Sequence, residues 1–282
     1  MKRVICILII LMLSLSGCAS FNEVDADKVK DVSDKITQTI IDSVGKENAE
    51  RQESHKLEAK NLSKLKIESS VGDIFIAAHD SSEATVDIKI TAKSSSKERS
   101  QELVDNFSYS VMEKWDAIEI NTIQDDIKIL NSDNIQTELT INIPKNIESF
   151  IIALNVGEIT VNNTDGQFEI NNNVGNIEIN NSVGSFNLKA DVGEIVLNSC
   201  TPLNKTELKT NTGDIKAVFS DISDARTIKA ETGVGDIEIT TPDNSSYEAE
   251  IDEFMQDKMV VYKENKNTKI ELKTGVGDIN FK

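Results

Sequence analysis

The sequence predicts an all-β protein, a β-solenoid or β-helix-like stack of short strands with glycines at the corners. Glycines recur every nine residues in the middle of the chain, and apolar residues stand at the second and fourth positions after each of them. Because side chains alternate along a strand, each repeat has one apolar edge that it can bury only against its neighbours. The same Gly-X-apolar step returns at looser spacing on both sides of these repeats. The predicted corner glycines are Gly72, Gly157, Gly166, Gly175, Gly184, Gly193, Gly213, Gly235 and Gly277.

The N-terminal residues predict export and lipidation. Lys2 and Arg3 precede the apolar run from Val4 to Leu15, which has the length of a signal-peptide core and is too short to span a membrane. The Leu-Ser-Gly-Cys motif that ends at Cys18 resembles the lipobox of bacterial lipoproteins, whose cysteine is diacylated. The resemblance implies a signal peptide over residues 1–17 and a palmitate-type anchor on Cys18. The protein is then expected outside the cytoplasm on the bacterial cell membrane, or on the outer membrane of a two-membrane cell, because two acyl chains anchor stably.

Charge and cysteine content restrict the partners. The chain has 30 basic and 48 acidic residues, a net charge of −18, which becomes −20 when the signal peptide is removed. This balance disfavours nucleic acid as a partner, because nucleic-acid affinity rests on neutralising phosphates. Cys200 is the only cysteine after Cys18, so no internal disulfide is expected. We expect Cys200 to be a small buried side chain or a loop thiol.

Residues 18–61 are expected to be a tether that contains an amphipathic helix. Apolar residues at three- and four-residue steps predict the helix over residues 26–45. It is either a spacer that docks or frays, or a coiled-coil or partner-binding helix. Residues 46–60 are expected to be linker. The apolar residues of the helix are Val29, Val32, Ile36, Ile40 and Val44.

Residues 62–282 are expected to form one solenoid domain in three parts. Residues 62–150 are an irregular opening section, residues 151–199 carry the nine-residue repeats, and residues 200–282 are looser closing coils. Alternating apolar residues predict the strands of the opening section, and the polar stretch 94–106 is helix-capable. Residues 220–226 and 242–268 are expected to be excursions. The predicted opening strands are 65–67, 74–78, 85–91, 107–112, 117–121 and 138–143.

The corners explain the spacing of the repeats. A valine precedes most of the glycines, and the Gly bend is expected to let this valine and the next apolar residue both point inward. Asparagines recur at a second phase of the repeat, where they tolerate left-handed backbone and can form amide ladders. Nine residues are too few for a closed coil, so we expect two or three repeats per coil. A coil of eighteen residues would place Ile159, Ile177 and Ile195 over one another.

The recurrence of these motifs supports a family resemblance. Spaced Val-Gly-Asp-Ile steps, the strand from Leu139 to Pro144, the break at Thr241-Pro242 and the closing Gly-Asp-Ile resemble the bacterial β-strand-repeat domain of unknown function labelled "putative adhesin". The resemblance covers about residues 62–282. It implies a β-helix-like fold and a place in the cell envelope, and it brings no catalytic residue.

Few residues suggest chemistry. Acids that follow the glycines suggest calcium, but calcium-binding nonapeptide rolls supply more ligands per turn, so a turn-favouring polar residue is the competing interpretation. His55 and His79 have no ligand partners at metal spacing and are expected to be exposed loop residues. Trp115 is the sole tryptophan; exposed aromatics could stack on sugars, but core packing or loop anchoring is expected. The acids after glycine are Asp73, Glu158, Glu194, Asp214, Asp236 and Asp278.

These observations favour a lipid-anchored, non-enzymatic envelope protein that displays an adhesin-like binding surface. We expect no cofactor and no metal. The partners are expected to be the membrane, through the anchor, and an envelope or host-surface component; the oligomeric state is left open. The alternatives are a structural or accessory envelope protein in stress signalling through residues 26–45, and a carbohydrate-active enzyme.

Overall fold

The computed structural model describes residues 47–123, 129–130, 132–242, 247–251, 258–263 and 268–282. The chain divides into two compact units. Among the described residues, the larger unit contains 51–90, 107–123 and those of 136–282, and the smaller contains 47–50, 91–106, 129–130 and 132–135. The predicted signal peptide, Cys18 and the helix predicted over residues 26–45 lie outside the described residues. In the part of the chain that is described, no helix is both long and apolar enough to cross a membrane.

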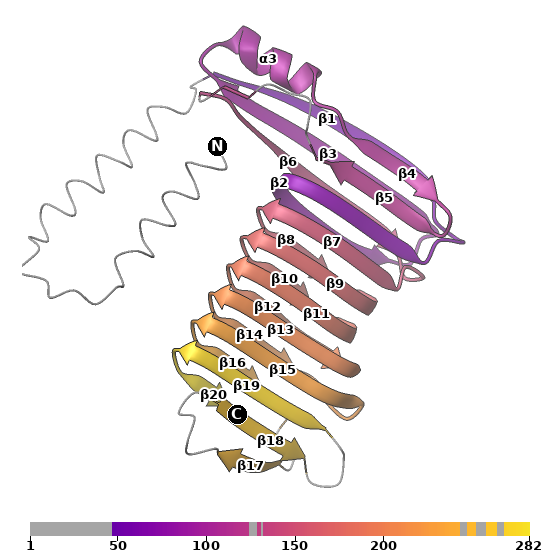
Figure 1. The fold of residues 1–282 in the computed structure, drawn as a ribbon. Helices are drawn as coiled ribbons and strands as arrows, with labels where there is room; N and C mark the ends of the chain where they lie inside the picture. Colours follow the sequence, from indigo (N-terminus) through magenta and orange to yellow (C-terminus); the bar gives the residue numbers. More distant parts are fainter. Residues whose placement is uncertain (1–46, 124–128, 131, 243–246, 252–257, 264–267) are drawn as a thin grey trace, which may run out of the picture. The chain divides into compact units, whose positions relative to one another are not determined.

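The larger unit is a β-solenoid, as the sequence predicts. Each coil contributes one strand to each of two parallel sheets, sheet A and sheet B, which stack along the solenoid (Figure 1). The strands of sheet A include β6 (Asn134–Pro144), β8 (Ile159–Asn162), β10 (Ile177–Asn180), β12 (Ile195–Pro202), β14 (Ile215–Phe219), β16 (Ile237–Thr240) and β20 (Ile279–Phe281). The strands of sheet B include β5 (Ala117–Thr122), β7 (Ser149–Val156), β9 (Asp165–Val174), β11 (Val183–Val192), β13 (Asn204–Thr212), β15 (Ala225–Val234) and β19 (Lys269–Val276).

The central coils are eighteen residues long, and their register confirms the stacking that the sequence predicts. Ile177 pairs in parallel with Ile159 on one side and with Ile195 on the other. All three side chains are fully buried between the sheets. Each fully buried isoleucine contributes roughly 1.5–3 kcal/mol through removal of apolar surface from water. The core is therefore a set of continuous apolar columns that run through successive coils.

Glycine forms the corner between each long strand of sheet B and the next short strand of sheet A. Gly175 has φ +126°, and a Cβ atom built on it would lie 1.9 Å from the carbonyl oxygen of Gly157 in the preceding coil. Glycine is thus required twice, for its positive φ and for the close approach of the backbone. The two nine-residue units of a coil are not equivalent, however. Gly166 and Gly184 lie at the start of β9 and β11, and Gly184 does not adopt positive φ.

The second corner is formed by asparagine, as predicted. Asn163 and Asn181 have φ 55° and 51°. Beside them, the Nδ2 group of Asn180 donates to Oδ1 of Asn162 at 3.0 Å, and that of Asn198 donates to Oδ1 of Asn180 at 2.8 Å. Such a ladder satisfies one amide of each coil with the amide of the next. Asn171 and Asn172 belong to the long strand β9 and lie elsewhere in the coil.

The prediction that the corner valines point into the core is wrong. Val234 is 50% exposed and Val276 is 66% exposed, and the equivalent valines of the central coils are half-buried. The residue two positions earlier points inward instead. There, Thr232 and Thr274 donate side-chain hydrogen bonds at 2.8 Å to the corner glycine carbonyls of the preceding coil. A polar side chain thus satisfies a carbonyl that the bend leaves without a strand partner.

The opening section contains longer strands than expected. Residues 46–60 do not form a linker, because β1 (Glu47–Glu58) occupies most of them, so the first strand precedes the predicted domain boundary at residue 62. The two strands predicted over 65–78 are one strand, β2 (Lys64–His79), which passes through the bend at Gly72 and pairs in both sheets. The strands β3 (Glu83–Ser94), β5 and β6 contain their predicted ranges, whereas β4 (Ser110–Lys114) begins three residues later than the predicted strand 107–112.

The smaller unit includes the helix α3 (Lys97–Asp105), within the helix-capable stretch that the sequence predicts. Ser96 caps its N-terminus by accepting a hydrogen bond from the N–H of Arg99. Asp133 is buried and accepts from Ser94 Oγ at 2.6 Å and from the Arg99 guanidinium at 2.9 Å. Burial alone would raise the pKa of Asp133, but these bonds and one from the N–H of Leu130 lower it below its ordinary value. The carboxylate therefore fastens α3 to the segment around residue 133.

The closing coils contain the two excursions. Residues 220–224 form a short connection between β14 and β15, with Ile222 buried. Within 242–268, the strands β17 (Tyr247–Ile251) and β18 (Lys258–Lys263) form an antiparallel pair, and β18 pairs with β19. The second excursion therefore adds antiparallel strands beside the last long strand of sheet B.

Candidate binding surface

The acids that follow the corner glycines form a ladder along the solenoid. Asp236 Oδ1 accepts a hydrogen bond at 2.8 Å from the N–H of Asp278, and the N–H of Asp236 donates at 2.9 Å to Asp214 Oδ1. Asn176 makes the same bond to the N–H of Glu194 at 2.9 Å. Each side chain thus connects its own coil to the following one. This structural role accounts for the Gly-Asp motif without a bound cation.

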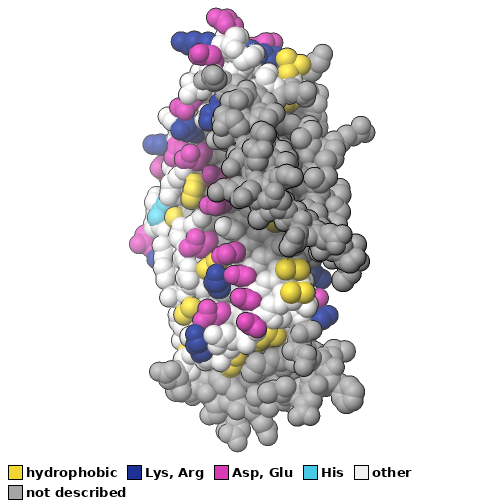
Figure 2. All heavy atoms as spheres, turned by 90° about the vertical axis from the view of Figure 1, so that its left-hand side faces the viewer, with side chains coloured by type: hydrophobic (Ala, Val, Ile, Leu, Met, Phe, Trp, Pro, Cys, Tyr) yellow, Lys and Arg dark blue, Asp and Glu magenta, His cyan; other side chains and the backbone are white. Residues whose placement is uncertain are grey.

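Lysines neutralise part of this ladder. Lys216 lies between Glu194 and Asp214, with Nζ to carboxylate distances of 3.6 and 3.4 Å. Outside the ladder, Lys282 pairs with Glu238 of β16 at 2.7 Å. Figure 2 shows one face of the molecule on which Asp and Glu side chains gather among a few Lys and Arg side chains. Within the described residues, no group of three or more His, Cys, Asp or Glu side chains is arranged to hold a metal ion.

Substitution at Asp236 separates the geometry of this ladder from its charge. We expect Asp236→Ala to lower the free energy of unfolding by about 1 kcal/mol, because the N–H of Asp278 loses its acceptor. Asp236→Asn should stay close to wild type, since Asn176 already performs this role. Chemical denaturation followed by circular dichroism measures the difference. Equal losses for the two variants would show that the carboxylate charge, and not the acceptor, is needed.

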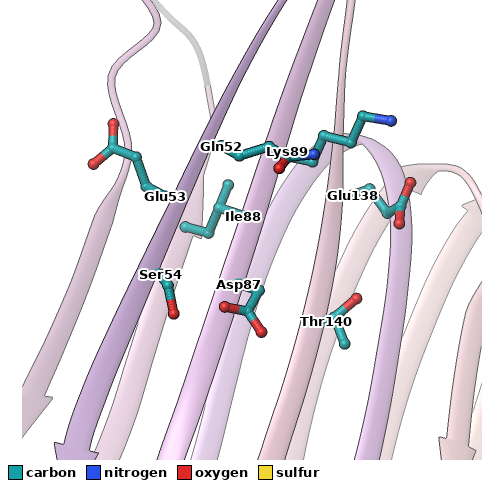
Figure 3. A pocket seen from close by; sticks show the side chains of 8 residues that line it. All are labelled: Gln52, Glu53, Ser54, Asp87, Ile88, Lys89, Glu138 and Thr140. Atoms are coloured by element: carbon teal, nitrogen blue, oxygen red, sulfur yellow. The ribbon is translucent and has the colours of Figure 1, made fainter.

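A shallow groove crosses the outer face of β1, β3 and β6. It encloses about 300 Å³, and all of its lining side chains except Ile88 are polar or charged (Figure 3). Ser54, Asp87 and Thr140 lie abreast on the three strands, and Gln52, Lys89 and Glu138 lie abreast one step along them. Sequence reasoning did not find this groove, because it depends on β1, which was expected to be linker.

A second groove of about 410 Å³ lies on the outer face of sheet B, over β7, β9, β11 and β13. Its floor carries Glu169, Asn187 and Glu207, which are paired in register on adjacent strands. A hydrogen bond from Lys205 lowers the pKa of Glu207 despite its partial burial. Glu207 is therefore an ionised carboxylate, whereas a general acid requires a raised pKa. The groove has the chemistry of a polar contact surface.

A cluster of hydrogen-bonding side chains joins β1 to the segment before β4. Tyr109 donates its hydroxyl proton to Glu53 at 2.6 Å and lies 2.9 Å from Nε2 of His55. Arg51 pairs with Glu53 at 3.0 Å and donates to the carbonyl of Phe107 at 2.8 Å. Burial and the bond to Glu53 raise the pKa of Tyr109 to about 12. The cluster connects the edge strand of sheet A to the edge of sheet B.

The histidines differ from the expectation of exposed loop residues. His55 lies within β1 and is part of the cluster around Tyr109, with its ring edge-on to the phenol ring. His79 is the last residue of β2 and accepts a hydrogen bond through Nδ1 from the N–H of Ser81. Both side chains are half-buried. The sequence could not show this, because neither β1 nor the length of β2 was predicted.

Cys200 is buried, in agreement with the first of its two predicted environments. Burial raises the pKa of its thiol to about 11. Its Sγ atom lies 3.4 Å from the carbonyl oxygen of Ile179 in the preceding coil. A neutral, enclosed thiol is unreactive, so Cys200 is a packing residue.

Trp115 is not in the core, which corrects the expectation of core packing. It lies in the two-residue turn between β4 and β5, is 93% exposed and has φ 58°. The strands predicted on either side of residues 113–116 place this tryptophan at a hairpin tip. Its exposure could not be predicted, because the alternation of apolar residues shows which side chains point inward in a strand and says nothing of residues in a turn.

The fold places the protein in the class of β-solenoids. Its side-chain ladder and its two grooves lie on the outside of the solenoid. Residues 164–282 match the model of the family described as Toastrack DUF4097. No curated protein matches the chain.

Three solved structures match the chain at low identity. A putative cell adhesion protein from Clostridium sporogenes has 16% identity and a TM-score of 0.41, over 83% of this chain and 99% of that chain. A putative adhesin from Bacteroides fragilis has 14% identity and a TM-score of 0.36, over 82% and 97%. A putative lipid binding protein from Parabacteroides distasonis has 12% identity and a TM-score of 0.24, over 82% and 94%.

Proposed function

We propose that this protein is a lipid-anchored cell-envelope protein whose solenoid presents a non-catalytic, adhesin-like binding surface. The carrying observation is the repetition of outward side chains at the same position of successive coils. Glu169, Asn187 and Glu207 form one such row, and the acids after the corner glycines form another. Rows of this kind offer an extended partner the same contact several times.

The grooves support binding more than catalysis. Both are open to solvent. The first is lined by polar or charged side chains apart from Ile88, and the second by polar side chains together with three phenylalanines and the exposed Ile151. Catalysis requires groups whose pKa is matched to proton transfer in a water-excluded site. The hydrogen bond from Lys205 lowers the pKa of Glu207 in the second groove, which favours its ionised form. A binding role needs only fixed donors and acceptors, which the rigid strands supply.

The anchor follows from the sequence around Cys18. Diacylation there would tether the mature chain and leave the solenoid to project from the membrane surface. The acidic net charge opposes close contact between the solenoid and anionic lipids. Binding partners are then expected outside the cytoplasm, among envelope or host-surface components.

The anchor and the binding surface are tested separately. Mass spectrometry of the mature N-terminus should find a diacylated Cys18, and Cys18→Ser should release the protein from membranes. The full mature chain should retain envelope material in a pull-down, and it should release no product from envelope glycans. Loss of signalling with retained surface binding, after deletion of residues 26–45, would favour the accessory signalling role. Sustained turnover of a glycan would favour an enzyme.

A further inference from the structure

Trp115 lies at the exposed tip of the hairpin formed by β4 and β5. The strands β4 and β5 pair in antiparallel register up to Lys114 and Ala117, so Trp115 and Asp116 alone form the turn. The indole is 93% exposed, whereas Ala117, Ile118 and Ile120 of the same hairpin are buried. The strand after Trp115 therefore contributes side chains to the core, whereas the Trp115 side chain contributes none.

The backbone at Trp115 is also unfavourable for this residue type. Its φ of 58° lies in the left-handed region, which bulky side chains rarely occupy. The first position of a two-residue hairpin turn with positive φ favours glycine. Such strain persists where the surroundings hold it, and it concentrates at functional sites. Tryptophan at this position therefore lowers the stability of the fold through backbone strain, and its exposed side chain adds no packing contacts that would offset this.

Polar side chains around the turn are held in place. Asp116 accepts from Ser63 Oγ at 3.1 Å and pairs with Lys64 at 3.1 Å. The bond to Lys64 lowers the pKa of Asp116, so the carboxylate is ionised. Lys114 pairs with Glu119 at 3.3 Å across the hairpin. Trp115 is therefore flanked in sequence by two charged side chains, Lys114 and Asp116, each of which has an ion-pair partner on the protein surface.

We propose that Trp115 is the stacking platform of a carbohydrate-binding site, with Lys114 and Asp116 as its polar partners. One face of a pyranose ring carries C–H groups and matches an indole face, while its hydroxyl edge requires donors and acceptors beside the ring. The hairpin tip supplies both. This inference rests on the proposed function, because it assigns a ligand class to the binding surface.

The charges of the tip disfavour the other uses of an exposed tryptophan. Membrane insertion would bring Glu113 and Asp116 into the headgroup layer together with the ring, in a protein of strongly negative net charge. A protein interface core needs a contiguous apolar patch around its aromatic anchor. Within residues 110–122, only Met112 adds another apolar side chain that is more than a third exposed. A single sugar ring needs no more apolar area than the indole.

The sole tryptophan makes the test direct, because all tryptophan emission comes from position 115. The full mature chain is titrated with a β-1,4-linked glucose hexamer, a β-1,4-linked N-acetylglucosamine hexamer and soluble glycan released from the envelope. We expect at least one of them to shift the emission to shorter wavelength and to protect it from acrylamide quenching. No change with all three would overturn the proposal. A shift with phosphatidylcholine vesicles in place of the glycans would also overturn it, in favour of membrane insertion.

Two variants separate the site from the fold. Trp115→Gly should weaken glycan retention by at least about tenfold and raise the thermal midpoint by roughly 2–4 °C through release of strain. Trp115→Phe should keep retention within about threefold of wild type. Equal glycan retention by Trp115→Gly and wild type would refute the platform. Envelope retention that survives in Trp115→Gly would leave the proposed function standing, whereas a wild-type chain that retains no envelope material would refute that function.

Discussion

Gly175→Ala is expected to lower the free energy of unfolding by roughly 3–5 kcal/mol, although it adds a single methyl group. Strain at positive φ costs of order 1–3 kcal/mol, and forced overpacking adds a similar amount. At Gly175 both apply, because φ is +126° and the new Cβ would lie 1.9 Å from the carbonyl oxygen of Gly157. The colliding atom belongs to backbone and cannot rotate away. Denaturation followed by circular dichroism measures the loss.

The consequence should extend beyond one corner. Gly193 packs against the carbonyl of Gly175 in the same way, so a displaced corner at Gly175 alters the contact of the following coil as well. In repeat architectures, stability is approximately the sum of each repeat and its interfaces with its neighbours. A variant that breaks two interfaces in the middle of the stack should therefore show a broader, less cooperative transition.

Gly233→Ala is the matched control. Gly233 lies in the same kind of long strand, does not have positive φ, and its added Cβ would lie 2.6 Å from the carbonyl oxygen of Asn211. We expect a clearly smaller loss than for Gly175→Ala. Because the added Cβ at Gly233 also meets backbone, the comparison isolates positive φ and the closer contact at Gly175; equal losses would show that neither adds to the cost at the corner.

The coil itself could be predicted because its evidence is periodic. The nine-residue glycine spacing and the alternating apolar pairs specify strands, and they led to the eighteen-residue stacking of Ile159, Ile177 and Ile195. The left-handed asparagines at one corner were predicted for the same reason. Such predictions succeed because the same residue pattern recurs in several coils and each recurrence supports the same interpretation.

The features outside the repeat could not be predicted in this way. β1 is a polar, mostly exposed strand without alternating apolar residues, so it was taken for linker. The corner valines follow the apolar pattern but lie beyond the edge of the core. The inward position is two residues earlier, where Asn172 and Thr232 bond to corner glycine carbonyls of the preceding coil. The position of Trp115 at a strained turn likewise depends on hairpin geometry. The groove over β1, β3 and β6 and the exposed position of Trp115 were missed for these local reasons, whereas the row of acids after the corner glycines was visible in the repeat.

Phe168→Ala is expected to cost about 3–5 kcal/mol of unfolding free energy, the range for removal of a buried phenylalanine. The ring of Phe168 lies between those of Phe150 and Phe186, with centroid distances of 4.7 and 5.0 Å and interplanar angles of 6° and 14°. All three are nearly completely buried. The substitution removes two stacked contacts together with the buried area, and aromatic pairs contribute about 0.5–1.5 kcal/mol beyond their area.

The solenoid cannot close the resulting cavity. Backbone pairing holds Phe150, Phe168 and Phe186 in adjacent strands of sheet B, so the outer two rings cannot move together without breaking that pairing. Phe75→Ala is the control, because Phe75 is 38% exposed and its loss should cost less than about 2 kcal/mol. Phe168→Leu should fall between the two. A loss at Phe168 no larger than at Phe75 would mean that the coils relax toward one another, and the rigid spacing on which the outer rows depend would then be lost as well.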